Sequence, residues 1–246
     1  MEEEKEGKGK GSSMIRVGTC GWSYFSPSNF IREWKEKYAS RLQAYASIFD
    51  TLEVDSTFYK LPKVETAIKW HEEAKAVSKG FEFIPKAPKS ITHNNFDTAD
   101  LEKFIQVAKA MKASKLLFQT PPSFGYSQSN YKLVKDFFAK IEGFSVFWEP
   151  RGTWLEEANV QKLKGIGAGI VTDPLRLVVP FEQKTYYFRL HGFGKGMMYS
   201  YRFSDEELEK VKKTAIDISK KGDVYVMFNN TYMFEDALRF KKMLGI

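Results

Sequence analysis

Residues 185–228 read TYYFRLHGFGKGMMYSYRFSDEELEKVKKTAIDISKKGDVYVMF, and this stretch decides the fold. Its two ends, 185–191 and 223–228, are short runs rich in aromatic and β-branched residues, as in buried strands. Between them, Ser204 and Glu207 form a capping box, which indicates the start of a helix. The apolar residues that follow recur every three or four positions and give this helix one buried face: Leu208, Val211, Ala215 and Ile218. The stretch therefore predicts a strand, a helix and a second strand, the repeating unit of a parallel sheet.

The same alternation extends over the rest of the chain. Six further strands are predicted at 15–20, 51–55, 81–87, 115–120, 144–149 and 168–172. Helical periodicity is found in 30–49, 68–77, 101–111, 133–141, 155–163 and 232–244. Eight units in about 230 residues favour a single-domain TIM-type (β/α)8 barrel over a doubly wound open sheet. Residues 174–184 contain two prolines and no helical period, so the sixth helix is expected to be irregular or missing.

Composition is that of an ordinary globular protein. Hydrophobic residues make up 43% of the chain, and no apolar run approaches the roughly 18 residues of a membrane span. Residues 1–13 are charged and then rich in Gly and Ser, which predicts a disordered tail before a folded region at 14–246. A single cysteine, Cys20, and the lack of a secretory signal make a cytoplasmic location the default expectation.

The net charge of +7 favours anionic partners. The tail holds four acids and three lysines, so the remaining residues carry +8. A lysine-rich solvated surface is the simpler explanation of this charge, because no cluster of five or six basic residues occurs.

Side chains alternate along a strand, and barrel active sites form where the strands end. If the most apolar positions face the helices, one set of polar side chains faces the barrel interior: Glu53, Asp55, Lys86, Gln119, Glu149, Arg151, Arg189, His191 and Asn229. Asp173 follows the sixth strand. Because barrel interiors are normally filled by branched apolar residues, we expect these polar groups to converge in one cavity. The alternative is an ion-pair network that plugs the barrel, for example Glu149 with Arg189.

Four of these groups are the candidate catalytic residues. Glu149 is expected to exchange protons, and His191 has an ordinary pKa suited to acid–base catalysis near neutral pH. Lys86 and Arg189 are expected to stabilise negative charge. A hydrogen-bonded structural histidine is the alternative for His191.

The segments after strands seven and eight predict an anion site. Gly192, Gly194 and Lys195 belong to a glycine-rich loop, and the backbone N–H groups of such loops can approach a phosphate. Asn229 and Asn230 stand just before the last helix, whose first N–H groups lack partners within the helix. A plain flexible loop is the alternative.

No cofactor and no tight metal site are predicted. The three histidines include no H-E-x-x-H motif, and a single cysteine cannot form a zinc pair. A weak Mg²⁺ or Mn²⁺ site through carboxylate oxygens stays open, with Glu53, Asp55, Glu149 and Asp173 as ligands.

Aromatic side chains in the loops, together with the +8 charge, raise nucleic-acid binding as a second class of function, since they can stack on bases. They are Trp22, Tyr24, Phe25, Phe58, Tyr59, Trp154, Tyr199 and Tyr201. The same rings could instead line a sugar pocket or pack the loops, and His93 is a further candidate ligand contact.

Seven stretches, in order along the chain, carry a resemblance to a known family: GTCGWSY (18–24), FDTLEVDSTFYKLP (49–62), FEFIPKAPKSITH (81–93), LLFQTPPSF (116–124), WEPRGTW (148–154), YFRLHG (187–192) and VMFNN (226–230). With them the sequence resembles the DUF72, or YecE-like, family. This resemblance implies a TIM-type barrel but no reaction, because the likeness of the family to endonuclease IV and to sugar isomerases concerns the fold alone. The sequence lacks the histidine-rich metal set of endonuclease IV.

Two functions remain open at this point. The first is an enzyme, a hydrolase or an isomerase, that acts on a small anionic, phosphorylated or carbohydrate-like ligand at the carboxyl ends of the strands. The second is a nucleic-acid-binding barrel with a nuclease-like hydrolase activity. The sequence leaves the oligomeric state undecided.

Overall fold

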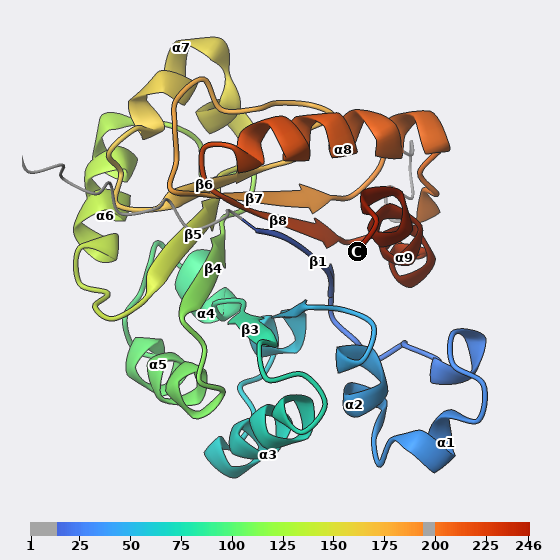
Figure 1. Ribbon diagram of the computed structural model, residues 1–246. Helices are drawn as coiled ribbons and strands as arrows, with labels where there is room; N and C mark the ends of the chain where they lie inside the picture. The colour runs from blue at the N-terminus through green and yellow to red at the C-terminus, as the bar shows by residue number, and fades with distance from the viewer. Residues whose placement is uncertain (1–13, 194–199) are drawn as a thin grey trace, which may run out of the picture.

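A computed structural model describes residues 14–193 and 200–246 (Figure 1). Its eight strands form one parallel sheet in the order β3-β2-β1-β8-β7-β6-β5-β4. The two outer strands, β3 and β4, are joined only by a parallel bridge between Lys86 and Leu117, so the barrel is nearly closed. The strand bounds are Ile15–Cys20 (β1), Thr51–Val54 (β2), Glu82–Pro85 (β3), Lys115–Gln119 (β4), Ser145–Glu149 (β5), Gly169–Thr172 (β6), Thr185–Leu190 (β7) and Asp223–Phe228 (β8). The predicted TIM-type barrel is confirmed.

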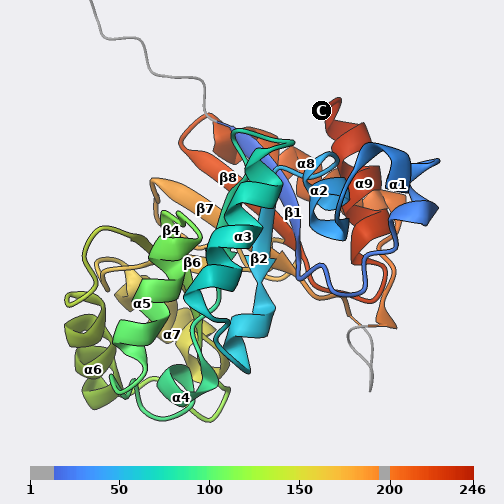
Figure 2. The same ribbon diagram turned by 90° about the horizontal axis from the view of Figure 1, so that it is seen from below.

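Helices surround the sheet on its outer side (Figures 1 and 2). They are α1 (Trp34–Lys37), α2 (Arg41–Ala46), α3 (Val64–Lys75), α4 (Lys89–Thr92), α5 (Leu101–Ala110), α6 (Gln128–Phe138), α7 (Glu157–Val160), α8 (Asp205–Ser219) and α9 (Met233–Leu244). The capping box predicted at the start of α8 is present, since Ser204 and Glu207 each bond the backbone N–H of the other. Between β6 and β7 the chain forms no helix, which confirms the expectation for the sixth unit.

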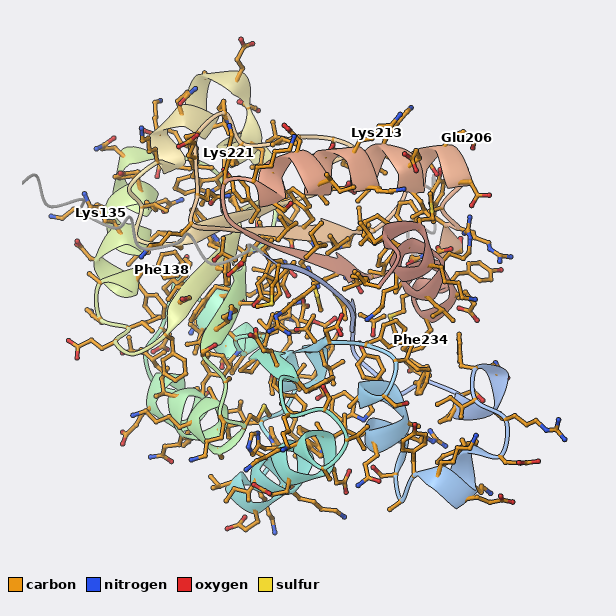
Figure 3. All side chains as sticks on the ribbon, in the orientation of Figure 1. Lys135, Phe138, Glu206, Lys213, Lys221 and Phe234 are labelled. Atoms are coloured by element: carbon orange, nitrogen blue, oxygen red, sulfur yellow. The ribbon has the colours of Figure 1, made fainter. Side chains whose placement is uncertain are left out.

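The single helix expected over residues 30–49 is wrong. Only α1 and α2 form there, and α2 starts afresh at Ser40, whose side chain caps it. The regular spacing of aromatic residues has a tertiary origin, because Phe30 and Tyr45 both pack against Phe234 of α9. Figure 3 shows Phe234 directed from α9 toward this segment.

Two apolar layers follow the predicted alternation of side chains. One layer lies between the strands and the helices and includes Leu52, Val54, Phe188 and Val226. The other fills the barrel interior: Cys20, Ile84, Leu117, Phe147, Val171, Tyr187, Tyr225 and Met227. This interior plug separates the polar groups at the two ends of the barrel.

A small ion-pair cluster closes the amino end of the barrel. Glu82 accepts hydrogen bonds from Tyr225 Oη at 2.6 Å and from Lys115 Nζ at 2.9 Å. Arg16 lies 3.4 Å from the other carboxylate oxygen of Glu82. These partners lower the pKa of Glu82 in spite of its burial.

Among the described residues, no helix combines the length and apolar character needed to cross a bilayer.

Candidate active site

Arg189, on the inner face of β7, is the centre of a charged cluster at the carboxyl end of the barrel. It donates to Glu53 of β2 through Nε (3.0 Å) and Nη2 (2.7 Å), and to Glu149 of β5 through Nη1. His191 Nε2 lies 3.9 Å from Glu149 Oε1 and 3.5 Å from Arg189 Nη1. These four side chains therefore meet in one cluster, and the Glu149–Arg189 ion pair that was the alternative is present. Of the polar groups expected to share one cavity, Glu149, Arg151, Asp173, Arg189 and His191 do so.

The expectation that Arg189 stabilises a ligand's charge stays a prediction, and the contacts of Arg189 bear on it. Its side chain is 1% exposed, and its guanidinium nitrogens face Glu53, Glu149 and, at 3.6 Å, Asp55. Removing ionised groups from water is costly unless they are paired. Arg189 is therefore engaged by the carboxyl groups of Glu53 and Glu149, although it also lines the cavity beside them.

Lys86 is engaged in a similar way. Its Nζ lies 3.4 Å from Asp55 Oδ1 and 4.6 Å above the ring of Phe58, and the residue is 8% exposed. Glu53, the other partner of Arg189, also accepts a hydrogen bond from Tyr187 Oη at 2.8 Å. Burial and the nearby charge of Asp55 raise the pKa of Glu53, against the opposing charge of Arg189.

A cavity of about 350 Å³ opens beside this cluster, at the carboxyl ends of β5, β6 and β7. Its polar wall contains Glu149, Arg151, Thr172, Asp173, Arg176, Arg189 and His191, and its apolar wall contains Pro122, Pro150, Leu155, Val171 and Leu177. Small-molecule sites occupy about 300–1,000 Å³, so this cavity suits a small ligand. The missing sixth helix matters here, because the loop that replaces it supplies Arg176 and Leu177.

Glu149 is an ionised carboxylate held between two arginines. Its Oε1 accepts from Nε and Nη2 of Arg151, at 3.1 and 2.9 Å, and its Oε2 accepts from Arg189. Burial opposes ionisation, but the positive charges of Arg189 and Arg151 outweigh it and hold the pKa of Glu149 well below its usual range. Such a group is a weak base at neutral pH. The predicted proton exchange at Glu149 is thus corrected to a fixed negative charge.

Asp173, directly after β6, has a pKa that is shifted in the opposite direction. Its side chain is 7% exposed, and Oδ1 accepts the backbone N–H of Leu175 at 3.0 Å. Its Oδ2 is buried, has no hydrogen-bond partner among the residues that the structure describes, and lies 3.6 Å from Arg176 Nε. Burial raises the pKa of Asp173 to about 6, and the negative charge of Glu149 adds to this effect. Asp173 is therefore the carboxyl group of this cavity that changes protonation near neutral pH.

His191 is neutral in this setting. Burial lowers the pKa of His191 to about 4, although the nearby charge of Glu149 opposes the shift. The sequence expectation of a pKa suited to neutral pH is therefore wrong. As a neutral imidazole on the cavity wall, His191 can offer a hydrogen bond but not a proton at pH 7.

Several predicted ligand contacts lie elsewhere. Trp154 is fully buried and donates from Nε1 to the carbonyl oxygen of Phe124, so its assignment as a ligand contact is wrong. Phe25 is buried as well, at 1% exposure, and Trp22 packs edge-on against Trp70. Two of the eight aromatic residues proposed for base stacking are thus inaccessible. Tyr24 and Tyr59 are exposed at the surface, and Tyr199 lies outside the described residues.

The predicted anion site after β7 and β8 is only partly described. Gly194 and Lys195 lie outside the described residues. Asn230 donates to the carbonyl oxygen of Tyr201 at 2.7 Å and to Asp236 at 2.8 Å, so its amide fixes the turn before α9. Its neighbour Asn229 is half-buried in that turn, and Gln119 donates to the carbonyl oxygen of Thr120.

The backbone at position 192 requires a glycine. Its φ of +91° lies in the left-handed region, and a Cβ there would come within 2.3 Å of Tyr201. Tyr201 therefore packs directly over this backbone, and its hydroxyl donates to Glu207.

Eight cavity residues were missed by the sequence analysis: Pro122, Pro150, Gly152, Leu155, Val171, Thr172, Arg176 and Leu177. Two of them lie in the irregular segment after β6, where periodicity gives no information on side-chain direction. The three-residue spacing of Asp173 and Arg176 is the one available signal, since oppositely charged residues so spaced in a turn often pair.

One group of metal-type ligands is present in the described part of the chain. Cys20, Glu53 and Asp55 hold ligand atoms within 4.8 Å of one another. Burial raises the pKa of the Cys20 thiol well above its usual value, which disfavours a thiolate ligand. Arg189 faces both carboxylates, so a metal ion would compete with a protein cation. The absence of a tight metal site stays a prediction.

Known proteins with similar sequences and folds support the family resemblance. UPF0759 protein YunF from Bacillus subtilis is 28% identical over 95% of this chain and 94% of its own length. The crystal structure of a DUF72 family protein from Enterococcus faecalis has a TM-score of 0.74 at 22% identity, covering 95% of this chain and 98% of that one. A GH18 chitinase from Pseudoalteromonas aurantia shares the fold more distantly, with a TM-score of 0.57 at 9% identity over 95% of this chain and 99% of that one. The family model described as "Protein of unknown function DUF72" matches residues 16–246, so the chain belongs to the DUF72 family.

Proposed function

We propose that this protein is an acid–base hydrolase that cleaves a C–O bond in a small, anionic, carbohydrate-like ligand. The observation that carries the proposal is the pair of carboxyl groups on one cavity wall. Asp173 has a pKa raised to about 6, whereas Glu149 stays ionised. Two carboxyl groups whose surroundings push their pKa values apart are the arrangement in which one acts as acid and the other as a fixed charge.

The division of roles follows from this difference. Protonated Asp173, which lines the cavity, donates its proton to the oxygen of the bond that breaks. The negative charge of Glu149 stabilises the positive charge that develops on the carbon. A water molecule then adds its hydroxyl to that carbon, and its other proton returns to Asp173. Neutral His191 can donate a hydrogen bond to the ligand.

The lining favours a ligand that is both anionic and partly apolar. Arg151 and Arg176 stand at the cavity with 27% and 49% of their side chains exposed, whereas Arg189 is buried. Prolines and leucines form the opposite wall, against which the C–H face of a sugar can pack. The chitinase that shares the fold acts on a carbohydrate, which is consistent with this ligand class but at 9% identity does not establish it.

The test compares two leaving groups on the same sugars. A panel of 4-nitrophenyl and methyl glycosides, with and without phosphate or carboxylate groups, is assayed with the wild type and with D173N and E149Q. Loss of the proton donor should slow the methyl glycoside far more than the 4-nitrophenyl glycoside, because nitrophenolate leaves without protonation. Loss of Glu149 should slow both. Turnover of the methyl glycoside should fall as the pH rises above about 6, the pKa of Asp173.

E65Q is the matched control, since Glu65 is exposed in the first turn of α3. Circular dichroism establishes that each variant is folded. Equal slowing of both glycosides by D173N, or no cleavage of any panel member at millimolar concentration, would contradict the proposal.

A further inference from the structure

A second, smaller hollow adjoins the cavity across the segment after β4. It has a volume of about 100 Å³ and is lined by Thr92, His93, Asn95, Pro121, Ser123 and Phe124. Pro122 lines the larger cavity, so the two hollows share the Pro121–Pro122 segment. A water molecule occupies about 30 Å³ of liquid, so the hollow holds a group the size of a tetrahedral anion rather than a second sugar ring.

The described lining of this hollow contains no lysine or arginine, but positive charges stand near His93. Lys89 precedes it by four residues, and the His93 N–H bonds the Lys89 carbonyl oxygen at 2.9 Å, so the two residues are neighbours on one helical turn. The rings of His93 and Phe58 meet edge-on at 5.2 Å, and Lys86 Nζ lies 4.6 Å from the centre of the same Phe58 ring. On the other side of the proline pair, Arg151 lines the larger cavity.

These cations favour the neutral form of the His93 imidazole. Partial burial, followed by the charges of Lys89, Lys86 and Arg151, lowers the pKa of His93. The hydroxyl of Thr92 lies 3.0 Å from Nδ1 of His93. That hydroxyl also donates to the carbonyl oxygen of Pro88 at 3.4 Å, so Nδ1–H of His93 donates to Thr92 and Nε2 carries the lone pair of the neutral ring. Nε2 becomes an N–H donor when the ring is protonated, the form that a bound anion favours. The hydroxyl of Ser123 and the amide of Asn95 are further donors in the lining.

We propose that the His93 hollow is a phosphate-binding subsite, which receives the phosphate group of a phosphorylated carbohydrate whose reacting bond lies between Glu149 and Asp173. This inference rests on the proposed function for the identity of the substrate, but phosphate binding itself can be measured without any reaction. Lys89 lies one helical turn before His93, and Arg151 lines the larger cavity beyond the proline pair, so a cation stands on each side of the subsite. The proline pair supports the part of the ligand that joins the two hollows.

Inorganic phosphate is the first probe. Phosphate is titrated into the wild-type protein at constant ionic strength, balanced with sodium chloride, while the imidazole C–H resonances of the three histidines are followed by NMR. The H93Q variant identifies the His93 resonance. Bound phosphate should move this resonance and raise the pKa of His93, because a nearby anion favours the imidazolium form. His71, on α3, should show neither change.

Charge variants define where the phosphate binds. K89A should weaken phosphate binding about threefold to tenfold, because it removes one charged partner. K213A is the matched control, since Lys213 projects from the outer side of α8 (Figure 3) and should leave binding unchanged. A His93 resonance that is unmoved by tens of millimolar phosphate, or equal binding by wild type and K89A, would overturn the subsite.

A matched substrate pair separates this inference from the proposed function. The pair is 4-nitrophenyl glucoside and its 6-phosphate, assayed with the wild type and K89A. A lower KM for the phosphorylated substrate, lost in K89A and competed by inorganic phosphate, supports the subsite. Cleavage with equal KM for both substrates leaves the hydrolase standing and refutes the subsite. Phosphate binding at His93 without cleavage of any glycoside refutes the hydrolase and leaves an anion site that takes free phosphate.

Discussion

Replacing Arg189 by Met would leave the buried carboxylate of Glu149, and the buried carboxyl group of Glu53, without their cation. Arg189, Glu53 and Glu149 are 1%, 0% and 8% exposed, so water cannot take over the role of the guanidinium. Removal of one partner from a buried ion pair typically costs roughly 3–5 kcal/mol. We expect the free energy of unfolding of R189M to fall by about this amount at pH 7. At about 2–4 °C per kcal/mol for a protein of this size, Tm should fall by roughly 6–20 °C.

The pH dependence of this loss identifies its cause. In the wild type the folded-state pKa of Glu149 lies below the unfolded value, so its stabilisation is present above that value and is lost as the pH falls through the folded pKa. Without Arg189 the folded-state pKa of Glu149 should rise above the unfolded value of about 4.3, and the variant should lose stability as the pH rises. The difference in stability between wild type and R189M is therefore expected to be largest near pH 7 and smaller near pH 5.

Urea unfolding followed by circular dichroism, at both pH values, measures the difference. R32M is the matched control, because Arg32 is 91% exposed and pairs only with its neighbour Glu33 among the ion pairs found. Its unfolding curve should match that of the wild type at both pH values. A loss below about 1 kcal/mol for R189M at pH 7, or the same loss at both pH values, would refute the role assigned to Arg189.

Three further predictions concern other parts of the fold. Y225F removes the hydroxyl that donates to Glu82 at 2.6 Å, and should lower the free energy of unfolding by about 1–2 kcal/mol in urea titrations; an unchanged midpoint would contradict the cluster at the amino end. G192A should cost more stability than G143A, because both glycines have positive φ but only at Gly192 would a Cβ meet Tyr201; equal costs would show that the contact is unimportant. EDTA should leave Tm unchanged and elemental analysis should find no stoichiometric zinc, whereas one zinc ion per chain would reverse this expectation.

Strand alternation carried most of the prediction of the site. It placed Glu53, Glu149 and Arg189 on the inner face of the barrel because a strand has only two faces, and polar residues at alternate positions then share one of them. The same reasoning could not give their protonation states. The pKa of His191 depends on how deeply it is buried and on which charges surround it, and both follow from tertiary packing.

The wrong or missing predictions of the sequence analysis lie in irregular segments of the chain. The loop after β6 has no period, so the position of Arg176 at the cavity could not be derived from its sequence. The aromatic residues at 30–49 are spaced like a helix face, but no single helix forms there, and two of them, Phe30 and Tyr45, pack against Phe234 of α9. Trp154 follows a strand end, as a ligand contact would, and is instead a buried packing residue. Sequence position alone does not distinguish an exposed loop aromatic from a buried one.

The central claim is that the two cavity carboxyl groups, Asp173 and Glu149, have widely different pKa values. A carboxyl ¹³C NMR titration of the protein tests this claim directly. Asp173 should titrate near pH 6, where burial and the charge of Glu149 place its pKa. Glu149 should remain ionised through this range, because Arg189 and Arg151 hold its pKa low. The D173N and E149Q variants assign the two resonances. An Asp173 resonance that titrates at the ordinary aspartate value of about 3.9, or a Glu149 resonance that titrates near neutral pH, would contradict the account.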